Sequence, residues 1–191
     1  MPPGQPATPE QFIEEGVASW YGAQFNGHRT SNGETYNMYE FTAAHRTLPF
    51  NSVVRVTNLN NGKQIEVRIN DRGPFVANRI IDLSLAAARA VELVGPGTAV
   101  VRLELISGSN PAIGFFGVQV GAFTVQENAE RLRARLAERY SPVTIQMVDS
   151  GNGVFYRVRV GRVTDEAAAR QLAQQLQTEE RVVPFVVRLD P

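Results

Sequence analysis

The fold of the first half of the chain depends on one stretch, EVRINDRGPF at positions 66–75. Within it Val67 and Ile69 alternate with polar residues, as does Ile65 before them, which is the period of a β-strand with one buried face. Asp71 continues the apolar spacing, and the Arg-Gly-Pro that follows predicts a turn. Burial against apolar neighbours raises the pKa of a carboxyl, so Asp71 is a candidate general acid. The alternative is that Asp71 caps the turn by accepting backbone N–H groups, with Arg72 as a surface ion-pair partner.

The composition excludes several classes of protein. The 191 residues are enough for one ordinary domain or two small ones, and 43% of them are hydrophobic. Nineteen basic residues balance nineteen acidic ones, so no net field attracts nucleic acid or an anionic membrane. The absence of Cys excludes disulfides, thiolate metal sites and a Cys nucleophile. With His28 and His45 as the only histidines, we expect neither a metal nor another cofactor.

The N-terminal segment carries no recognisable targeting signal. Residues 1–12 are rich in proline, which predicts disorder, and MPPGQP is neither a signal peptide nor a lipidation signal. No apolar run is long enough to span a bilayer. Two interpretations stay open at this point: a cytoplasmic protein, or an exported one whose export segment is not in this sequence.

Residues 13–106 are expected to form a small closed β-barrel. Short strands are predicted at 16–22, 51–58, 65–71, 79–83 and 99–106, with a hairpin turn at 60–62 and a small helix at 85–91 that Ser84 caps. A single helical turn is predicted at 41–47, before Pro49. Many short strands between Gly and Pro turns are typical of a barrel, which leaves no exposed sheet edges.

Four polar or aromatic residues of this half are candidates for a site, and each has a structural alternative. Glu34 lies in a long polar loop, 25–39, where an isolated carboxylate is most often only solvated. His45 lies on an apolar background, where a histidine is more often hydrogen-bonded and structural. Trp20 is expected in the core, although Trp20 and Tyr21 together could also line a sugar site.

A linker at 107–114 separates this half from residues 115–191, in which the pattern changes. Strands are predicted at 116–122, 143–148, 154–160 and 181–189, the last at a sheet edge because it holds Pro184. A helix follows a capping box at 124–127, and a second helix begins at Thr164. This order is β-α-β-β-α-β, a ferredoxin-like or RNP-like unit.

Strand parity predicts a binding face in the second half. Apolar residues of the first and third strands share one face, which should pack on the helices. The opposite face is expected to be open and to carry the polar, aromatic and basic residues Gln119, Phe123, Phe155, Arg157 and Arg159. Aromatics on central strands could instead bind RNA, but ten Arg against nine Asp and Glu from Phe115 onward leave a charge of only +1, so we expect no nucleic-acid partner.

Several motifs follow one another in the first half, between about Gly16 and Ile106. They are ASWYG at 18–22, TSNGE at 30–34, AAHRTLP at 43–49, VRVTN at 54–58, NDRGPF at 70–75 and IDLS at 81–84. Through these motifs the first half resembles the double-psi β-barrel of the RlpA (rare lipoprotein A) family of septal lytic transglycosylases. The second half resembles the SPOR domain, through GVQVGAF at 117–123 and YRVRVG at 156–161.

The resemblance implies a fold, an activity and a location. The fold would be a six-stranded double-psi β-barrel followed by a βαββαβ SPOR domain. The activity would be endolytic, non-hydrolytic cleavage of MurNAc-β-1,4-GlcNAc bonds in peptide-free peptidoglycan strands, with the SPOR domain directing the enzyme to denuded glycan at the division septum. The protein would be periplasmic, held by an N-terminal lipid anchor of the outer membrane, and divisome proteins are further candidate partners.

The resemblance also implies a catalytic set of Asp71, Glu34 and His45, which should share one cleft. We assign the acid/base role to Asp71, charge stabilisation or substrate orientation to Glu34, and support of the hydrogen-bond network to His45. Residues expected to contact glycan are Trp20, Tyr21, Arg72, Gln119, Phe123, Phe155 and Arg157. Two alternatives stay open: a glycoside hydrolase that uses Glu34 and Asp71 as its pair, and a non-catalytic wall-binding protein of the expansin type.

Overall fold

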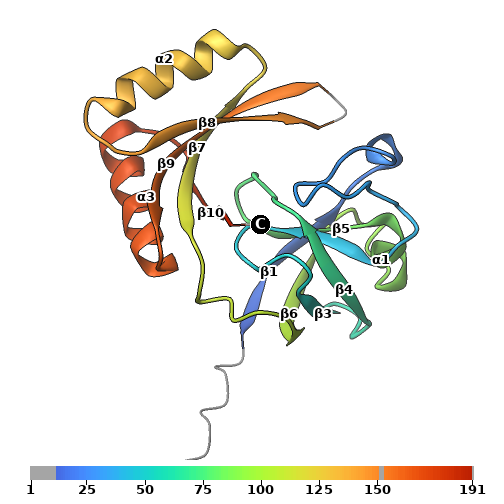
Figure 1. The fold of residues 1–191 in the computed structure, drawn as a ribbon. Coiled ribbons are helices and arrows are strands. Elements are labelled where there is room, and N and C mark those ends of the chain that lie inside the picture. The colour runs from blue at the N-terminus through green and yellow to red at the C-terminus, as the bar shows by residue number, and fades with distance from the viewer. Residues whose placement is uncertain (1–11, 151–152, 191) are drawn as a thin grey trace, which may run out of the picture.

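The computed structural model describes residues 12–150 and 153–190, which form a closed β-barrel and a helix-backed sheet (Figure 1). The six barrel strands are β1 (Ile13–Trp20), β2 (Thr42–His45), β3 (Val53–Asn58), β4 (Gln64–Asp71), β5 (Arg79–Leu83) and β6 (Ala99–Ser107). Their order around the barrel is β1-β5-β2-β4-β3-β6. The β1–β5 and β2–β4 pairs are parallel and the others antiparallel, so the barrel is mixed. The expected fold class is confirmed for this half.

The barrel interior is filled by the alternating apolar residues of its strands. In β4, Val67 and Ile69 are fully buried, as their period-2 spacing predicts, and they pack with Val54, Val56 and Leu103. The short helix α1 (Leu85–Ala90) closes one side, and the Ser84 hydroxyl accepts from the Ala87 N–H at its start. A short 3-10 helix, η1 (Ala23–Phe25), follows β1.

The prediction of a helical turn at 41–47 is wrong, because residues 42–45 form strand β2. All four residues are buried, and the strand lies between β4 and β5 in the closed barrel. Two alanines and a following proline favour a short helical turn locally. Pairing with β4 on one side and β5 on the other satisfies backbone groups of this buried segment, and that tertiary requirement outweighs local propensity.

The second half is a four-stranded antiparallel sheet in the order β10-β7-β9-β8, with two helices on one face. Its elements are β7 (Phe116–Phe123), α2 (Gln126–Ala137), β8 (Val143–Asp149), β9 (Val154–Val163), α3 (Glu166–Glu180) and β10 (Phe185–Arg188). The β-α-β-β-α-β order is therefore confirmed, and the strand after Pro184 lies at the sheet edge as predicted. The capping box is absent: α2 has Val125 at its N-cap without a side-chain bond, whereas Asp165 caps α3.

A β-bulge in β7 changes which residues share a face. The register with β9 shifts between Gln119 and Gly121, so the side-chain alternation reverses there. Phe123 consequently packs against the helix-side core, with Leu132 and Tyr156, and not beside Gln119. The prediction that Phe123 lies on the polar face is wrong for this reason.

The polar face of the sheet is turned toward the barrel, while α2 and α3 cover the opposite face (Figure 1). At the contact, the Arg188 backbone N–H donates to the Arg46 carbonyl (3.0 Å), and Arg188 Nε donates to the Thr47 carbonyl (2.7 Å). The rings of Phe75 and Phe185 meet edge to face with centroids 6.1 Å apart. The prediction that this face is open is therefore wrong: Gln119 is only 3% exposed and Arg159 only 9%.

Candidate active site

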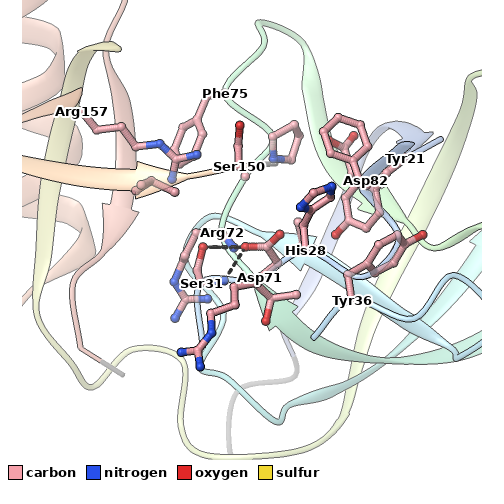
Figure 2. Close-up of a pocket in the computed structure, with 17 residues that line it drawn as sticks. Tyr21, His28, Ser31, Tyr36, Asp71, Arg72, Phe75, Asp82, Ser150 and Arg157 are labelled. Carbon is pink, nitrogen blue, oxygen red and sulfur yellow. Dashed lines mark hydrogen bonds between the residues drawn. The ribbon is translucent and has the colours of Figure 1, made fainter. Parts of the chain in front are cut away.

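A cavity of about 230 Å³ lies where the barrel meets the sheet (Figure 2). Its barrel side comes from the end of β1, the loop after η1, and the ends of β4 and β5. Its sheet side comes from the end of β8 and from β9. The lining includes Tyr21, Ser31, Ala44, Asp71, Arg72, Phe75, Asp82, Val148, Ser150 and Arg157.

Strand β2 places two carboxyl groups on either side of this cavity. Ala44 is the register partner of Asp71 in β4 and also of Asp82 in β5. Neighbouring strands lie about 4.8 Å apart, so the two aspartate Cα atoms are separated by about 10 Å. Ala44, whose side chain is a single methyl group, lies between them in the register and lines the same cavity.

Asp71 is held by three hydrogen bonds to one of its oxygens. Its Oδ1 accepts from the Ser31 N–H (2.9 Å), the Ser31 hydroxyl (2.5 Å) and the Arg72 N–H (2.8 Å). No described residue donates to Oδ2. Asp71 therefore accepts backbone N–H groups, as the turn-capping alternative predicted. It also lines the cavity, where its Oδ2 has no hydrogen-bond donor among the described residues.

The capping alternative predicted that Arg72 is a surface ion-pair partner. The structure contradicts this, because Arg72 is only 7% exposed. Its guanidinium lies 3.6 Å from the centroid of the Phe50 ring, and its Nη1 donates to the Leu48 carbonyl at 2.9 Å. Burial, and then the nearby charge of Arg188, lower the pKa of Arg72 to about 9. The buried cation fixes the turn that follows Asp71.

Asp82 is a further carboxyl of this cavity, and its pKa is raised. Burial raises its pKa to about 6; Arg79, 3.4 Å from Oδ2, opposes the shift, and the charge of Asp71 adds to it. Its Oδ1 is buried without a hydrogen-bond partner among the described residues. Asp82 was not predicted as a site residue. It alternates with the apolar Ile81 and Leu83, whereas Asp71 continues the apolar spacing of its strand.

Aromatic rings form the barrel wall of the cavity. Tyr21 meets Tyr36 edge to face with ring centroids 4.9 Å apart, and both rings line the cavity. Burial, followed by the charges of Asp71 and Asp82, raises the pKa of the Tyr21 hydroxyl well above its usual range. Trp20 instead packs against the barrel core. Of this predicted pair, only Tyr21 is placed to contact a ligand in the cavity.

Glu34 lies in a different polar cluster, on the other side of β4. Its two oxygens accept from Arg68 Nη1 (2.7 Å) and Nη2 (2.9 Å), and Oε2 also accepts from the Asn70 side chain. These bonds, that of Arg68 first, lower the pKa of Glu34 to about 2. Glu34 does not line the Asp71 cavity. The loop that carries Glu34 also carries Ser31, which donates to Asp71.

His45 is buried at 3% exposure and has both ring nitrogens engaged. Nδ1 accepts from the N–H groups of Thr47 and Leu48, so the proton must be on Nε2, which lies 2.9 Å from Glu14 Oε2. His45 lines another hollow, together with Glu14 and Arg46. It orders the loop whose Leu48 carbonyl holds Arg72.

The three residues of the predicted catalytic set have different positions. Asp71 lines the central cavity, whereas Glu34 and His45 are not among its lining residues. Their joint role in catalysis stays a prediction. No group of three or more His, Asp or Glu side chains that could hold a metal occurs within residues 12–150 and 153–190. None of the helices in those residues is long and apolar enough to cross a membrane.

The sheet side of the cavity is formed by Val148, Ser150 and Arg157. The Arg157 guanidinium lies 4.7 Å from the centroid of the Phe75 ring, so a cation of the second half is stacked on the turn after Asp71 (Figure 2). Phe155 is half-buried and in register with Val148, on the same sheet face. Gln119 is on this face too but is buried away from the cavity, and Phe123 is on the opposite face.

Comparisons with known proteins agree with this two-part architecture. A family described as "Lytic transglycolase" matches residues 13–103, and the SPOR domain family matches residues 112–188. A barrel of this kind followed by a SPOR domain defines a class of bacterial cell-wall proteins. Within it, the chain belongs to the RlpA family.

The chain is 45% identical to the endolytic peptidoglycan transglycosylase RlpA of Campylobacter jejuni, over 74% of this chain and 62% of that protein. It is 33% identical to the protein of the same name from Pseudomonas aeruginosa, over 92% of this chain and 70% of that protein. The chain thus spans less than two thirds of the first of these relatives. The crystal structure of the RlpA SPOR domain from Pseudomonas aeruginosa matches 40% of this chain and all of that chain, at 28% identity and a TM-score of 0.36.

Proposed function

We propose that the chain is an endolytic lytic transglycosylase that cleaves the MurNAc-β-1,4-GlcNAc bond of peptidoglycan and leaves 1,6-anhydro-MurNAc ends. One observation carries the proposal: in a chain of the RlpA family, two carboxyls flank a cavity, and one of them has a pKa raised to about 6. The relatives in Campylobacter jejuni and Pseudomonas aeruginosa bear the name of this activity.

The reaction needs one proton carrier and no water. The bond between MurNAc C1 and the GlcNAc O4 breaks, and O4 takes a proton from an acid. The MurNAc O6 then bonds to C1 and returns its proton to the same carboxylate. Atoms and charge balance, and positive charge develops on the sugar ring between the two steps.

The geometry supports Asp82 as the proton carrier. A general acid works best with a pKa near the working pH, and Asp82 is the cavity carboxyl whose pKa is raised into that range. Asp71, oriented by three donors on Oδ1, can then stabilise the developing ring charge through Oδ2. The sequence predicted the reverse assignment, with Asp71 as the acid. The pH profiles of the Asp71→Asn and Asp82→Asn variants distinguish the two assignments.

Glu34 and His45 are assigned as positioning residues. Glu34 fixes the loop that carries Ser31 onto Asp71, and His45 fixes the loop that holds Arg72. Tyr21, Arg72 and Arg157 are the predicted glycan-contacting residues for which the cavity supports that role.

The second half is proposed to bind peptide-free glycan and to direct the enzyme to the septum in the periplasm. The match to the SPOR domain family supports this proposal. We also propose divisome partners and a lipid anchor of the outer membrane. Membership of the RlpA family is the support for both.

Mass spectrometry of purified, peptide-free peptidoglycan strands after incubation with the chain tests the activity. We expect products with 1,6-anhydro-MurNAc ends. Reducing MurNAc ends would instead identify a glycoside hydrolase. Unchanged strands that still bind the chain would identify a wall-binding protein without catalytic activity.

A further inference from the structure

A second cavity, also of about 230 Å³, lies between the barrel and the sheet and adjoins the first. Ser31 and Arg72 line both cavities. The remaining lining comes from Phe50 of the barrel and from residues of the second half, Gln146, Arg159, Arg188, Leu189 and Asp190. Whole-ligand sites usually enclose about 300–1,000 Å³, so this space suits one group of a larger ligand whose body occupies the neighbouring cavity.

This second cavity carries an excess of buried positive charge. Three arginines line it, Arg72, Arg159 and Arg188, and each is less than a tenth exposed. Asp190 is the only acidic side chain in the lining, and it pairs with Arg188 at 2.9 Å. Burial lowers the pKa of Arg159 to about 10, with the charge of Arg157 as a further cause. Buried cations without a partner are unfavourable, and a bound anion removes that cost.

Two of these arginines have donor atoms to spare. Arg72 Nη2 and Arg159 Nε are buried and have no hydrogen-bond partner among residues 12–150 and 153–190. Arg188, by contrast, donates to the carbonyls of Thr47, Pro111 and Ile113 as well as to Asp190, so it is occupied in holding the two halves together. The free donors come from opposite walls, Arg72 from the barrel and Arg159 from the sheet.

We infer that Arg72 and Arg159 form an anion site between the two halves, and that its ligand is the free lactyl carboxylate of a muramyl residue without its stem peptide. The inference rests on the proposed function and deepens it. Guanidinium groups recognise carboxylates through paired, charge-assisted hydrogen bonds. In peptide-bearing glycan the lactyl group is an uncharged amide, and the attached peptide has no room in a cavity of this size. The site thus explains a preference for peptide-free strands at the place of cleavage itself.

The experiment compares two glycan fragments: a peptide-free muramyl tetrasaccharide with free carboxylates, and the same fragment with those carboxylates converted to neutral methylamides. Affinity is measured by calorimetry with the full chain carrying Asp82→Asn, to suppress turnover. We expect the carboxylate fragment to bind at least about tenfold more tightly, as for a lost hydrogen bond to a charged group. Equal affinities for the two fragments would overturn the inference.

The variants Arg159→Gln and Arg159→Lys, each in the same background, test the assigned residue. Arg159→Gln should bring the affinity ratio close to one by weakening only the carboxylate fragment. Arg159→Lys keeps the positive charge but loses the paired donors of the guanidinium group, so it should retain part of the preference for the carboxylate fragment. Arg162→Gln is the matched control, because Arg162 is an exposed arginine of the same strand that stacks on Phe115 and lines neither cavity. A full preference in folded Arg159→Gln would contradict the assignment.

A crosslinked chain tests whether the site belongs to the docked arrangement. Arg46 and Phe185 are in contact across the interface, 5.6 Å from guanidinium carbon to ring centroid, and the sequence contains no Cys. The pair Arg46→Cys and Phe185→Cys, joined by a short bis-maleimide, should keep the carboxylate preference. Loss of binding on crosslinking would show that docking hides the glycan site. If wild-type chain forms no anhydro ends but the carboxylate preference persists, the proposed activity fails and the anion site stands.

Discussion

Two carboxylate clusters flank the same strand of the barrel and differ in how completely they are satisfied. On one side of β4, Glu34 receives bonds from Arg68 and Asn70, and its pKa is lowered to about 2. On the other side Asp71 keeps one oxygen without a donor, and across the cavity the pKa of Asp82 is raised to about 6. Under the proposed function, this difference separates the roles: Glu34, with its partners in place, is structural, whereas Asp82, buried with an unpaired oxygen, carries the proton.

The largest effect should come from Asp82→Asn. If Asp82 carries the proton, turnover should fall by roughly 10²–10⁴-fold, measured as release of anhydro ends. In the wild type, kcat/KM should decline as the pH rises through about 6, where Asp82 loses its proton. Glu66→Gln, which alters an exposed carboxylate on β4, serves as the control. If Asp82→Asn keeps full activity while Asp71→Asn abolishes it, the acid is Asp71.

The same variant gives a stability prediction with a definite sign. The pKa of Asp82 is higher in the folded chain than its ordinary value of 3.8, so the folded state holds the proton more tightly than the unfolded state. Wild-type stability should therefore fall as the pH rises from about 4 to about 6, and Asp82→Asn should lack this part of the decline. Urea unfolding at several pH values measures it, and parallel curves for the two proteins would contradict the raised pKa.

A smaller but still large loss is expected from Ala44→Val. The added methyl groups would fill the space between Asp71 and Asp82, so substrate could not be placed between them. Misplacement of this order costs about a hundredfold in rate. Ala43→Val is the matched control, since the Ala43 side chain lies in the barrel core. The control should lower stability through overpacking, whereas Ala44→Val should lower activity more than stability.

His45→Ala should cost stability first and activity second. It removes the acceptor of two buried N–H groups, those of Thr47 and Leu48, and leaving buried donors unsatisfied costs about 1–3 kcal/mol. Loosening of this loop frees Arg72, so we expect turnover to fall by about tenfold as well. The free energy of unfolding and kcat are measured on the same sample. If activity fell by several orders of magnitude while stability stayed unchanged, His45 would take part in catalysis directly.

The smallest effect on turnover, within about tenfold, is expected for Glu34→Gln. The wild-type carboxylate has a pKa below its ordinary value of 4.5, so it stabilises the fold above that pH and loses this contribution as the pH falls toward about 2. The variant should consequently be less stable than wild type at pH 7 and approach it in acid. Because the ion pair with Arg68 is partly exposed, the difference should be modest. A thousandfold loss of turnover at full stability would make Glu34 catalytic.

Much of the fold was predictable because local pattern and tertiary structure agree. The alternation of Val67 and Ile69 gave β4, and the change of period after the linker gave the β-α-β-β-α-β unit. The pattern failed where neighbours in space decide. Residues 42–45 form a strand only because β4 and β5 lie on both sides, and Phe123 changes face because of a bulge that leaves no mark in the alternation.

The site was predictable in part. Asp71, Tyr21, Arg72 and Arg157 line the cavity, although their roles remain predictions. Asp82 was missed because its significance comes from Ala44, which brings it opposite Asp71. The burial of Gln119 and Arg159 could not be foreseen, since it depends on how two separately patterned halves dock.

The fastening of Arg188 onto the loop at Thr47 also fixes an order of events during synthesis. The barrel residues leave the ribosome before the sheet residues, and N-terminal domains generally fold first. The barrel can therefore close while one wall of its cavity has not yet been translated. Arg188, in the last strand of the sheet, is made after every other element of that wall. A newly made chain would thus form its barrel early and its complete cavity late.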